Sequence, residues 1–193
     1  GVLLYHTDEN YYVESTRNMV ESGDYLTPIH HDKKRFAKPI LYYWLMSASY
    51  KIFGVSLVSA CMTSAFFWRL AIGLLYLLSK RLFAGRTALY SVLILPATFL
   101  YFQISRLATT DIVMNFFILL AIYFFVCLYQ SDFKQKNDAY LFYLTMALGF
   151  MTKGPPAVII PGMVAFIFLI ATRRQGSWSQ MRMGQGLVIL LLV

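Results

Sequence analysis

Residues 112–129, IVMNFFILLAIYFFVCLY, form a long run without one charged side chain. A helix needs about 20 mainly apolar residues to cross the hydrocarbon core of a bilayer, so this run has nearly the full length required. Inside lipid, a spanning segment must satisfy its own backbone hydrogen bonds, and a single helix does so. The run therefore predicts a transmembrane α-helix.

The composition extends this prediction to most of the chain. Of the 193 residues, 59% are hydrophobic and only 13% are charged, whereas soluble domains carry about 25% charged residues. Other apolar runs cover residues 57–78, 87–102, 139–151, 157–172 and the segment from 186 onward. We expect an all-α polytopic membrane protein with a helix bundle over residues 57–193.

Both ends of the sequence fall within apolar segments. Residues 1–5, GVLLY, are typical of the last turn of an apolar helix, and residues 186–193, GLVILLLV, stop inside an apolar run. We expect an N-terminal fragment with three parts. These are the end of a first transmembrane helix at 1–5, a periplasmic loop at 6–56 and a truncated bundle at 57–193.

The basic residues predict an orientation. The formal net charge is +8, but Lys and Arg lie in the gaps between apolar runs, which does not favour nucleic-acid binding. Cytoplasmic loops of membrane proteins are enriched in Lys and Arg. The alternating loops that we place in the cytoplasm carry Lys80, Arg81, Arg86, Lys134, Lys136, Arg173 and Arg174. The opposite, non-cytoplasmic face then receives segment 6–56, Asp111 and Lys153.

The periplasmic loop is expected to contain two interfacial helices. Residues 8–26, DENYYVESTRNMVESGDYL, mix apolar and charged positions, and Gly23 is a typical stop signal. Residues 39–53 place Tyr42 and other aromatic residues where rings settle at the headgroup level. The linker between them, TPIHHDKKRFAKP at 27–39, is expected to be irregular. Its histidines lack a helical ligand spacing, so no metal site is predicted.

Three acidic residues on the outer face are candidates for chemistry. Asp8 and Glu9 follow an apolar segment, and Asp111 precedes the span at 112–129. Ionisable groups at this depth are costly and tend to line cavities. The alternative is helix capping, because carboxylates also stabilise the positive N-terminal end of a helix. The sequence leaves both interpretations open.

Basic residues on the same face are candidates for binding an anion. Lys38 precedes Pro39 and belongs to the cluster KKRFAK, which also contains Arg35. An ammonium at this depth suits a lipid phosphate, although the cluster could equally be a simple headgroup contact. Lys153, in MTKGPP, could bind an anion or extend to the interface. Arg106 ends the preceding span.

Five elements occur together in one order. They are the acidic pair 8–9, ESGDYLTP at 21–28, AKPILYYW at 37–44, TTD at 109–111 and LGFMTKGPP at 148–156. In combination they resemble the protein O-mannosyltransferase-like families of the GT-C glycosyltransferase superfamily. The sequence is most similar to the bacterial branch that contains the lipid A aminoarabinose transferase.

The resemblance implies a GT-C-type helix bundle with two interfacial helices in its first outer loop. It implies transfer of a sugar from a polyprenyl-phosphate donor to a lipid, glycan or protein acceptor. Asp8 would be catalytic or orient the acceptor, with Glu9 beside it, and Asp111 would line the same cavity. The substrate-binding candidates are Lys38, Arg35, Arg106, Lys153 and Tyr42. The partners would be the lipid-linked sugar and membrane lipids.

The sequence departs from the branch at two positions. Ala37 stands where the branch carries a glutamate associated with a metal, and Tyr11 stands where it carries an arginine. We therefore assign no metal, and Arg35 is our candidate for the missing phosphate ligand. A transporter or flippase of a lipid-linked or anionic substrate is the alternative. Transporters bind near the midplane in repeated helices, whereas no repeat is evident here and Arg69 is the one charged midplane residue.

Overall fold

The computed structural model describes residues 7–30, 33–34, 38–83, 85–174 and 180–193, without the side chains of residues 7–8 and 33–34. The elements in these ranges are α1 (Thr7–Ser22), β1 (Ile29–His30), β2 (Lys33–Lys34), α2 (Leu41–Phe53), α3 (Leu57–Leu82), α4 (Gly85–Ala97), α5 (Phe99–Ser105), α6 (Thr110–Gln130), α7 (Lys136–Lys153), α8 (Pro156–Ala171) and α9 (Met183–Leu192).

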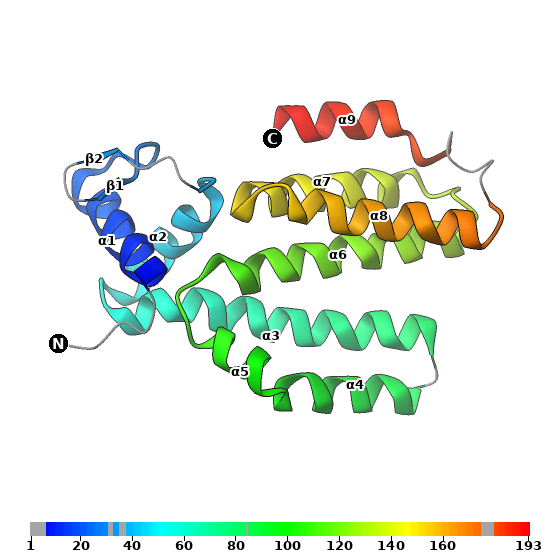
Figure 1. The fold of residues 1–193 in the computed structure, drawn as a ribbon, viewed down its shortest axis with the longest axis horizontal. Coiled ribbons are helices and arrows are strands. Elements are labelled where there is room, and N and C mark those ends of the chain that lie inside the picture. Colours follow the sequence, from blue (N-terminus) through cyan, green and yellow to red (C-terminus); the bar gives the residue numbers. More distant parts are fainter. Residues whose placement is uncertain (1–6, 31–32, 35–37, 84, 175–179) are drawn as a thin grey trace.

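The long helices run side by side, and the remaining elements gather at one end (Figure 1). We call this end, with α1, α2 and the β1–β2 hairpin, the outer end. The inner end holds the α6–α7 turn, the last turns of α3 and α8 and the first turns of α4 and α9. Among the described residues, α3 and α6 are each long and apolar enough to cross a membrane, and α4 with α5 could form a third, bent span. The helices predicted at 57–78 and 112–129 are thus confirmed as candidate spans.

The run at 87–102 is not one straight helix. It is divided into α4 and α5, whose axes differ by 67°. Pro96 lies in the last turn of α4, where proline removes a backbone donor and crowds the carbonyl one turn earlier. The chain then restarts at Thr98, which has an extended backbone. The segment predicted at 87–102 is therefore a bent pair of helices, which together are long and apolar enough for one broken span.

The outer loop contains the two expected helices. α1 is followed by Gly23, with φ +76°, and α2 is followed by Gly54, with φ +80°, a backbone conformation that favours glycine. The linker between them is less irregular than predicted, because Ile29 pairs with Lys34 and His30 with Lys33 in a short antiparallel hairpin. The all-α prediction therefore needs this small addition.

The core has two centres. Near the outer end, buried aromatic and aliphatic side chains of α1, α2, α3 and α6 pack together, including Tyr42, Met46 and Val113. Nearer the inner end, α6, α7 and α8 pack through residues such as Phe142. Many large apolar side chains on the outside of the bundle remain exposed, as expected for a surface that faces lipid.

Gly149 brings three helices close together. A Cβ atom at this position would lie 2.9 Å from the Cβ of Ala157 on α8 and 3.2 Å from the Cβ of Phe117 on α6. Close backbone approach through small residues is a usual way for membrane helices to pack. Since Lys153 lies one turn later on α7, this contact also fixes the base of its side chain.

Candidate active site

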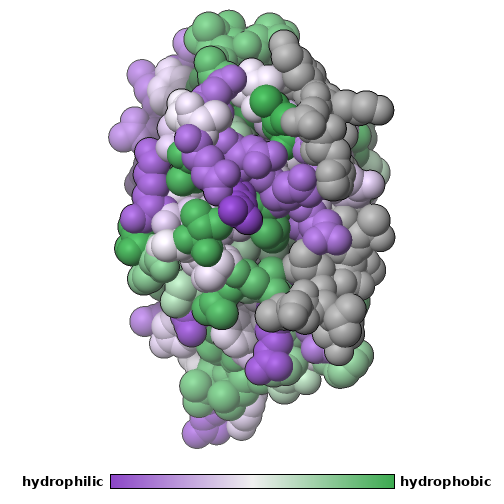
Figure 2. Space-filling view, turned by 90° about the vertical axis from the view of Figure 1, so that its left-hand side faces the viewer, coloured by the Kyte–Doolittle hydropathy of each residue, from purple (hydrophilic) through white to green (hydrophobic). Residues whose placement is uncertain are grey.

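The outer end presents a mixed surface. Viewed from that end, hydrophilic residues gather across the face and hydrophobic residues lie above and below them (Figure 2). A surface of this kind can accept a substrate that has a charged head and an apolar tail.

Lys38 and Lys153 line one cleft at this end, although they are far apart in sequence. The cleft has a volume of about 500 Å³. Its lining residues come from the turn after α1, the approach to α2 and the α7–α8 turn: Leu26, Pro28, Lys38, Pro39, Ile40, Phe150, Lys153, Gly154 and Pro155. Apart from the two ammonium groups, most of its side chains are apolar.

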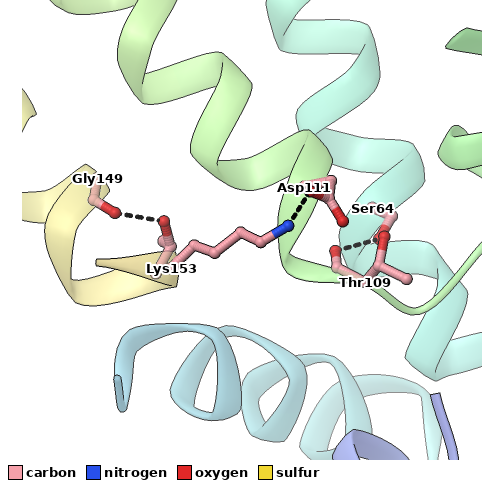
Figure 3. A network of polar contacts seen from close by, with 6 residues as sticks. Ser64, Thr109, Asp111, Gly149 and Lys153 are labelled. Carbon is pink, nitrogen blue, oxygen red and sulfur yellow. Dashed lines mark hydrogen bonds and ion pairs between the residues drawn. The ribbon is translucent and has the colours of Figure 1, made fainter. Parts of the chain in front are cut away.

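Asp111, in the first turn of α6, forms an ion pair with Lys153, the last residue of α7. The lysine side chain extends from the end of α7 toward the carboxylate in the first turn of α6 (Figure 3). Lys153 is 29% exposed and Asp111 is 44% exposed, so the pair remains open to solvent. The structure therefore brings two of the sequence candidates into direct contact, and through Lys153 it connects Asp111 to the cleft.

Glu9 makes the longest-range polar contact at the outer end. Its side chain is buried, with 3% exposure, and its carboxylate accepts a hydrogen bond of 2.7 Å from the backbone N–H of Ala108. The hydroxyl of Ser64 donates to the carbonyl of Thr109 at 3.3 Å. Both contacts hold the α5–α6 link immediately before Asp111, so Glu9 fixes the position of the α6 start.

Three sequence candidates cannot be placed in full. Asp8 lies in the first turn of α1, directly before Glu9, but its side chain is outside the described residues. Arg35 and Ala37 also fall outside them. Because α1 contacts the α5–α6 link through Glu9, the backbone of Asp8 lies at the same end as Asp111. The roles of Asp8 and Arg35 stay predictions.

Tyr42 and Arg106 lie elsewhere. Tyr42 is completely buried and packs edge-on against Tyr12, with ring centroids 5.1 Å apart. Burial raises the pKa of its phenol, so the hydroxyl remains protonated. Arg106 is an exposed residue whose guanidinium lies 4.5 Å from the ring centroid of Phe102. Neither residue lines the cleft that contains Lys38 and Lys153.

The described residues offer no metal site. Among them, no group of three His, Cys, Asp or Glu side chains comes together in a way that could hold an ion. His30 instead pairs with Glu14 at 3.0 Å and packs edge-on against Tyr11.

Sequence reasoning missed the apolar walls of the cleft. Leu26 and Pro28 belong to the segment ESGDYLTP, which helped to identify the family but was not assigned to the site. Asp24 stabilises the turn that contains these residues, because its carboxylate accepts hydrogen bonds from the backbone N–H groups of Leu26 and Thr27. Asp24, with Pro28 four residues later, was the available signal for a tight turn.

Two solved structures share this fold. They are crystal structures of ArnT from Cupriavidus metallidurans, one in the apo state and one bound to undecaprenyl phosphate, and their TM-scores are 0.86 and 0.87. In each case the likeness covers 98% of this chain and 36% of the other, at 24% sequence identity. At that identity the match shows the fold alone.

Sequence relatives lead to a family. An uncharacterised protein of Aquifex aeolicus is 35% identical over 167 residues. An undecaprenyl phosphate-alpha-4-amino-4-deoxy-L-arabinose arabinosyl transferase of Yersinia pestis is 32% identical over 175 residues, which are 89% of this chain. The chain spans 32% of the length of each relative. Residues 37–193 match the family model described as dolichyl-phosphate-mannose-protein mannosyltransferase, and the chain therefore belongs to this glycosyltransferase family.

Proposed function

We propose that the protein is a membrane glycosyltransferase that takes a sugar from an undecaprenyl-phosphate donor at the periplasmic face of a bacterial inner membrane. The observation that carries the proposal is the outer cleft, which both Lys38 and Lys153 line and in which Lys153 is paired with Asp111. The relative in Yersinia pestis is named for such a donor, and one of the ArnT structures contains undecaprenyl phosphate.

The two lysines suit the leaving group of this reaction. When the bond between the sugar and the phosphate breaks, the bonding electrons move to a phosphate oxygen and negative charge develops there. Cations held in place before the reaction stabilise that charge without reorganising. An ammonium group has three donors, so Lys153 can bind a phosphate oxygen while it remains paired with Asp111.

The apolar walls suit the lipid part of the donor. Leu26, Pro28 and Phe150 line the same cleft as the lysines. A phosphate that carries a hydrocarbon chain matches this combination, whereas a free nucleotide sugar would leave the apolar walls facing water. Arg35, close in sequence to Lys38, is our candidate for a further phosphate contact.

The carboxylates have separate roles in the proposal. The acceptor oxygen attacks the anomeric carbon, and if the acceptor is a hydroxyl, its proton moves to a base, for which Asp8 is our candidate. Asp111 positions Lys153 and lies beside the reacting sugar. Glu9 is a positioning residue, because its carboxylate points into the protein. Arg106, an exposed residue directly after the last turn of α5, remains a candidate for contact with an anionic acceptor.

The test is transfer by the full-length protein in membranes supplied with a labelled undecaprenyl-phosphate sugar. We expect label to move from the donor to an acceptor, and we expect Asp8→Asn to abolish this transfer while the variant still folds in detergent. Arg174→Gln, at the inner end, is the control and should keep full activity. Movement of intact donor across the bilayer without transfer would instead show a flippase.

A further inference from the structure

A second cleft with basic walls lies at the inner end. It has a volume of about 620 Å³, and its lining comes from the α6–α7 turn and the start of α9: Phe133, Lys134, Lys136, Gln180, Arg182, Gly184 and Gln185. Three of these residues are cations, and none of the described lining residues is a carboxylate. The α6–α7 turn and the start of α9, which line it, lie at the opposite end of the bundle from α1 and α2 (Figure 1).

Arg182 is held in position by neutral groups. One nitrogen of its guanidinium donates to the hydroxyl of Tyr140 at 2.7 Å and to the side-chain oxygen of Gln185 at 3.0 Å. The Tyr140 hydroxyl in turn donates to Gln185 at 2.9 Å. These contacts orient the guanidinium without neutralising it, and among the described residues no carboxylate forms an ion pair with it, so its other nitrogens can bind an anion.

Arg174, at the same end, provides a contrast. Its guanidinium forms an ion pair of 2.6 Å with the carboxylate of Asp132, so much of its charge is offset nearby. It does not line the basic cleft. The two arginines therefore carry the same charge at the same end of the bundle, but only Arg182 directs an uncompensated charge toward a cavity.

The start of α9 adds to the positive potential. Arg182 precedes this helix with φ 53°, a left-handed conformation, and no side chain caps the helix. The first backbone N–H groups of a helix carry partial positive charge. Gly184 lines the cleft, and the space beside its backbone is open, so an anion can come close to these groups.

An apolar groove lies next to the basic cleft. Its volume is about 200 Å³, and it is lined by residues of α7, α8 and the start of α9: Phe142, Tyr143, Met146, Gly162, Ala165, Phe166, Met181, Met183, Leu187 and Leu190. Residues 180–187 thus contribute to both cavities, and the buried Met181 is fixed by a hydrogen bond of 3.0 Å from the Tyr143 hydroxyl to its carbonyl. A charged pocket and an apolar groove share one segment.

We propose that this inner-end pair of cavities binds an anionic glycerophospholipid of the cytoplasmic leaflet. The phosphate lies among Lys134, Lys136 and Arg182, and an acyl chain follows the apolar groove. Arginine binds phosphate through two parallel hydrogen bonds, and lysine binds it as a point charge. Basic pockets between membrane helices on the cytoplasmic side are typical sites for anionic headgroups. The proposal does not depend on the transfer reaction at the outer end.

The test counts lipids retained by the full-length protein in native mass spectrometry, with phosphatidylglycerol and phosphatidylcholine as probes. We expect Arg182→Gln to weaken phosphatidylglycerol binding about tenfold, because a charge-assisted pair is lost. The control Arg174→Gln removes the same charge outside the cleft and should bind as the unchanged protein does. Arg182→Lys should recover part of the loss.

A second variant tests the cleft in case Arg182→Gln fails to fold. Lys134 and Lys136 are exposed, so the double variant Lys134→Ala/Lys136→Ala should fold normally and should also lose phosphatidylglycerol. Equal retention by both cleft variants and by Arg174→Gln would overturn the proposal, as would equal retention of phosphatidylcholine. If inorganic phosphate alone saturated the cleft at concentrations that displaced no lipid, the site would bind free phosphate and the lipid assignment would be wrong.

Discussion

The two ends of the bundle use charge in different ways. At the outer end, polar side chains are held by partners far away in sequence, as in Glu9 with the Ala108 amide and Asp111 with Lys153. At the inner end, basic residues predominate in the loops, and the ion pair between Arg174 and Asp132 is exposed, at 44% and 63%. Glu9 is buried and the Asp111–Lys153 pair is less exposed than the Arg174–Asp132 pair, although the partners of both pairs are 42 positions apart in sequence.

This difference separates two purposes of charged residues in a membrane protein. Loop lysines and arginines set orientation by their number and need no exact geometry. Charges that bind or transform a substrate need fixed positions. Substitutions should therefore have large effects at the outer end and small effects at the inner end, with Arg182 and its cleft as the exception that we propose.

After the complete loss of transfer expected for Asp8→Asn, the largest effect should be that of Lys153→Met on transfer. Methionine keeps most of the side-chain length but removes the ammonium, so we expect kcat/KM to fall by about 100-fold or more. Steady-state transfer of labelled sugar in membranes measures this. Lys80→Met, at the inner end of α3, is the matched control and should retain activity. If the two variants were equally active, transfer would not depend more on charges at the outer end than on charges at the inner end.

Next in size is the effect of Glu9→Ala on stability. This change leaves the buried N–H of Ala108 without its acceptor, which costs about 1–3 kcal/mol. Thermal unfolding in detergent should show a lower midpoint. Glu9→Gln keeps a carbonyl oxygen that can accept the same bond and should recover most of the loss. A normal midpoint for Glu9→Ala would contradict the role of Glu9 as the link between α1 and α6.

A similar or smaller effect is expected for Gly149→Ala. The added methyl group would press on Ala157 and Phe117, and overpacking of this kind costs about 1–3 kcal/mol. Gly73→Ala is the matched control, because nothing lies within 4 Å of the added atom there. The thermal midpoint should fall for Gly149→Ala and stay level or rise for Gly73→Ala. The opposite order would refute the close contact of α6, α7 and α8.

The smallest effect should come from Asp132→Asn. This variant breaks an exposed ion pair with Arg174, and such pairs contribute little to stability. We expect no resolvable change in the thermal midpoint or in transfer. A clear loss of stability would mean that the inner end is held together by specific charge pairs, and the contrast between the ends would then disappear.

The sequence predicted those features that depend on neighbouring residues. Long apolar runs located α3 and α6, and Gly23 located the end of α1. The grouping of Asp111 and Lys153 on one face followed from counting the crossings between them. Such features could be predicted because a helix is determined largely by residues three or four positions apart.

Other features depend on packing between distant segments and could not be predicted. The sequence around Glu9 does not show what its carboxylate does. A hydrogen-bond acceptor for Ala108, a catalytic acid and a helix cap would all fit the same residues. Pro96 marked a possible break, but not the 67° angle between α4 and α5. Arg182 was not selected at all, because its cleft exists only when α9 packs beside the α6–α7 turn.

The most direct test of the account is the affinity of the full-length protein for undecaprenyl phosphate. Lys38→Ala and Lys153→Ala should each weaken binding about tenfold or more, because each removes one cation from the phosphate, while Arg174→Gln should bind as the unchanged protein does. If both lysine variants bound the lipid as tightly as the unchanged protein, the outer cleft would not be the phosphate site.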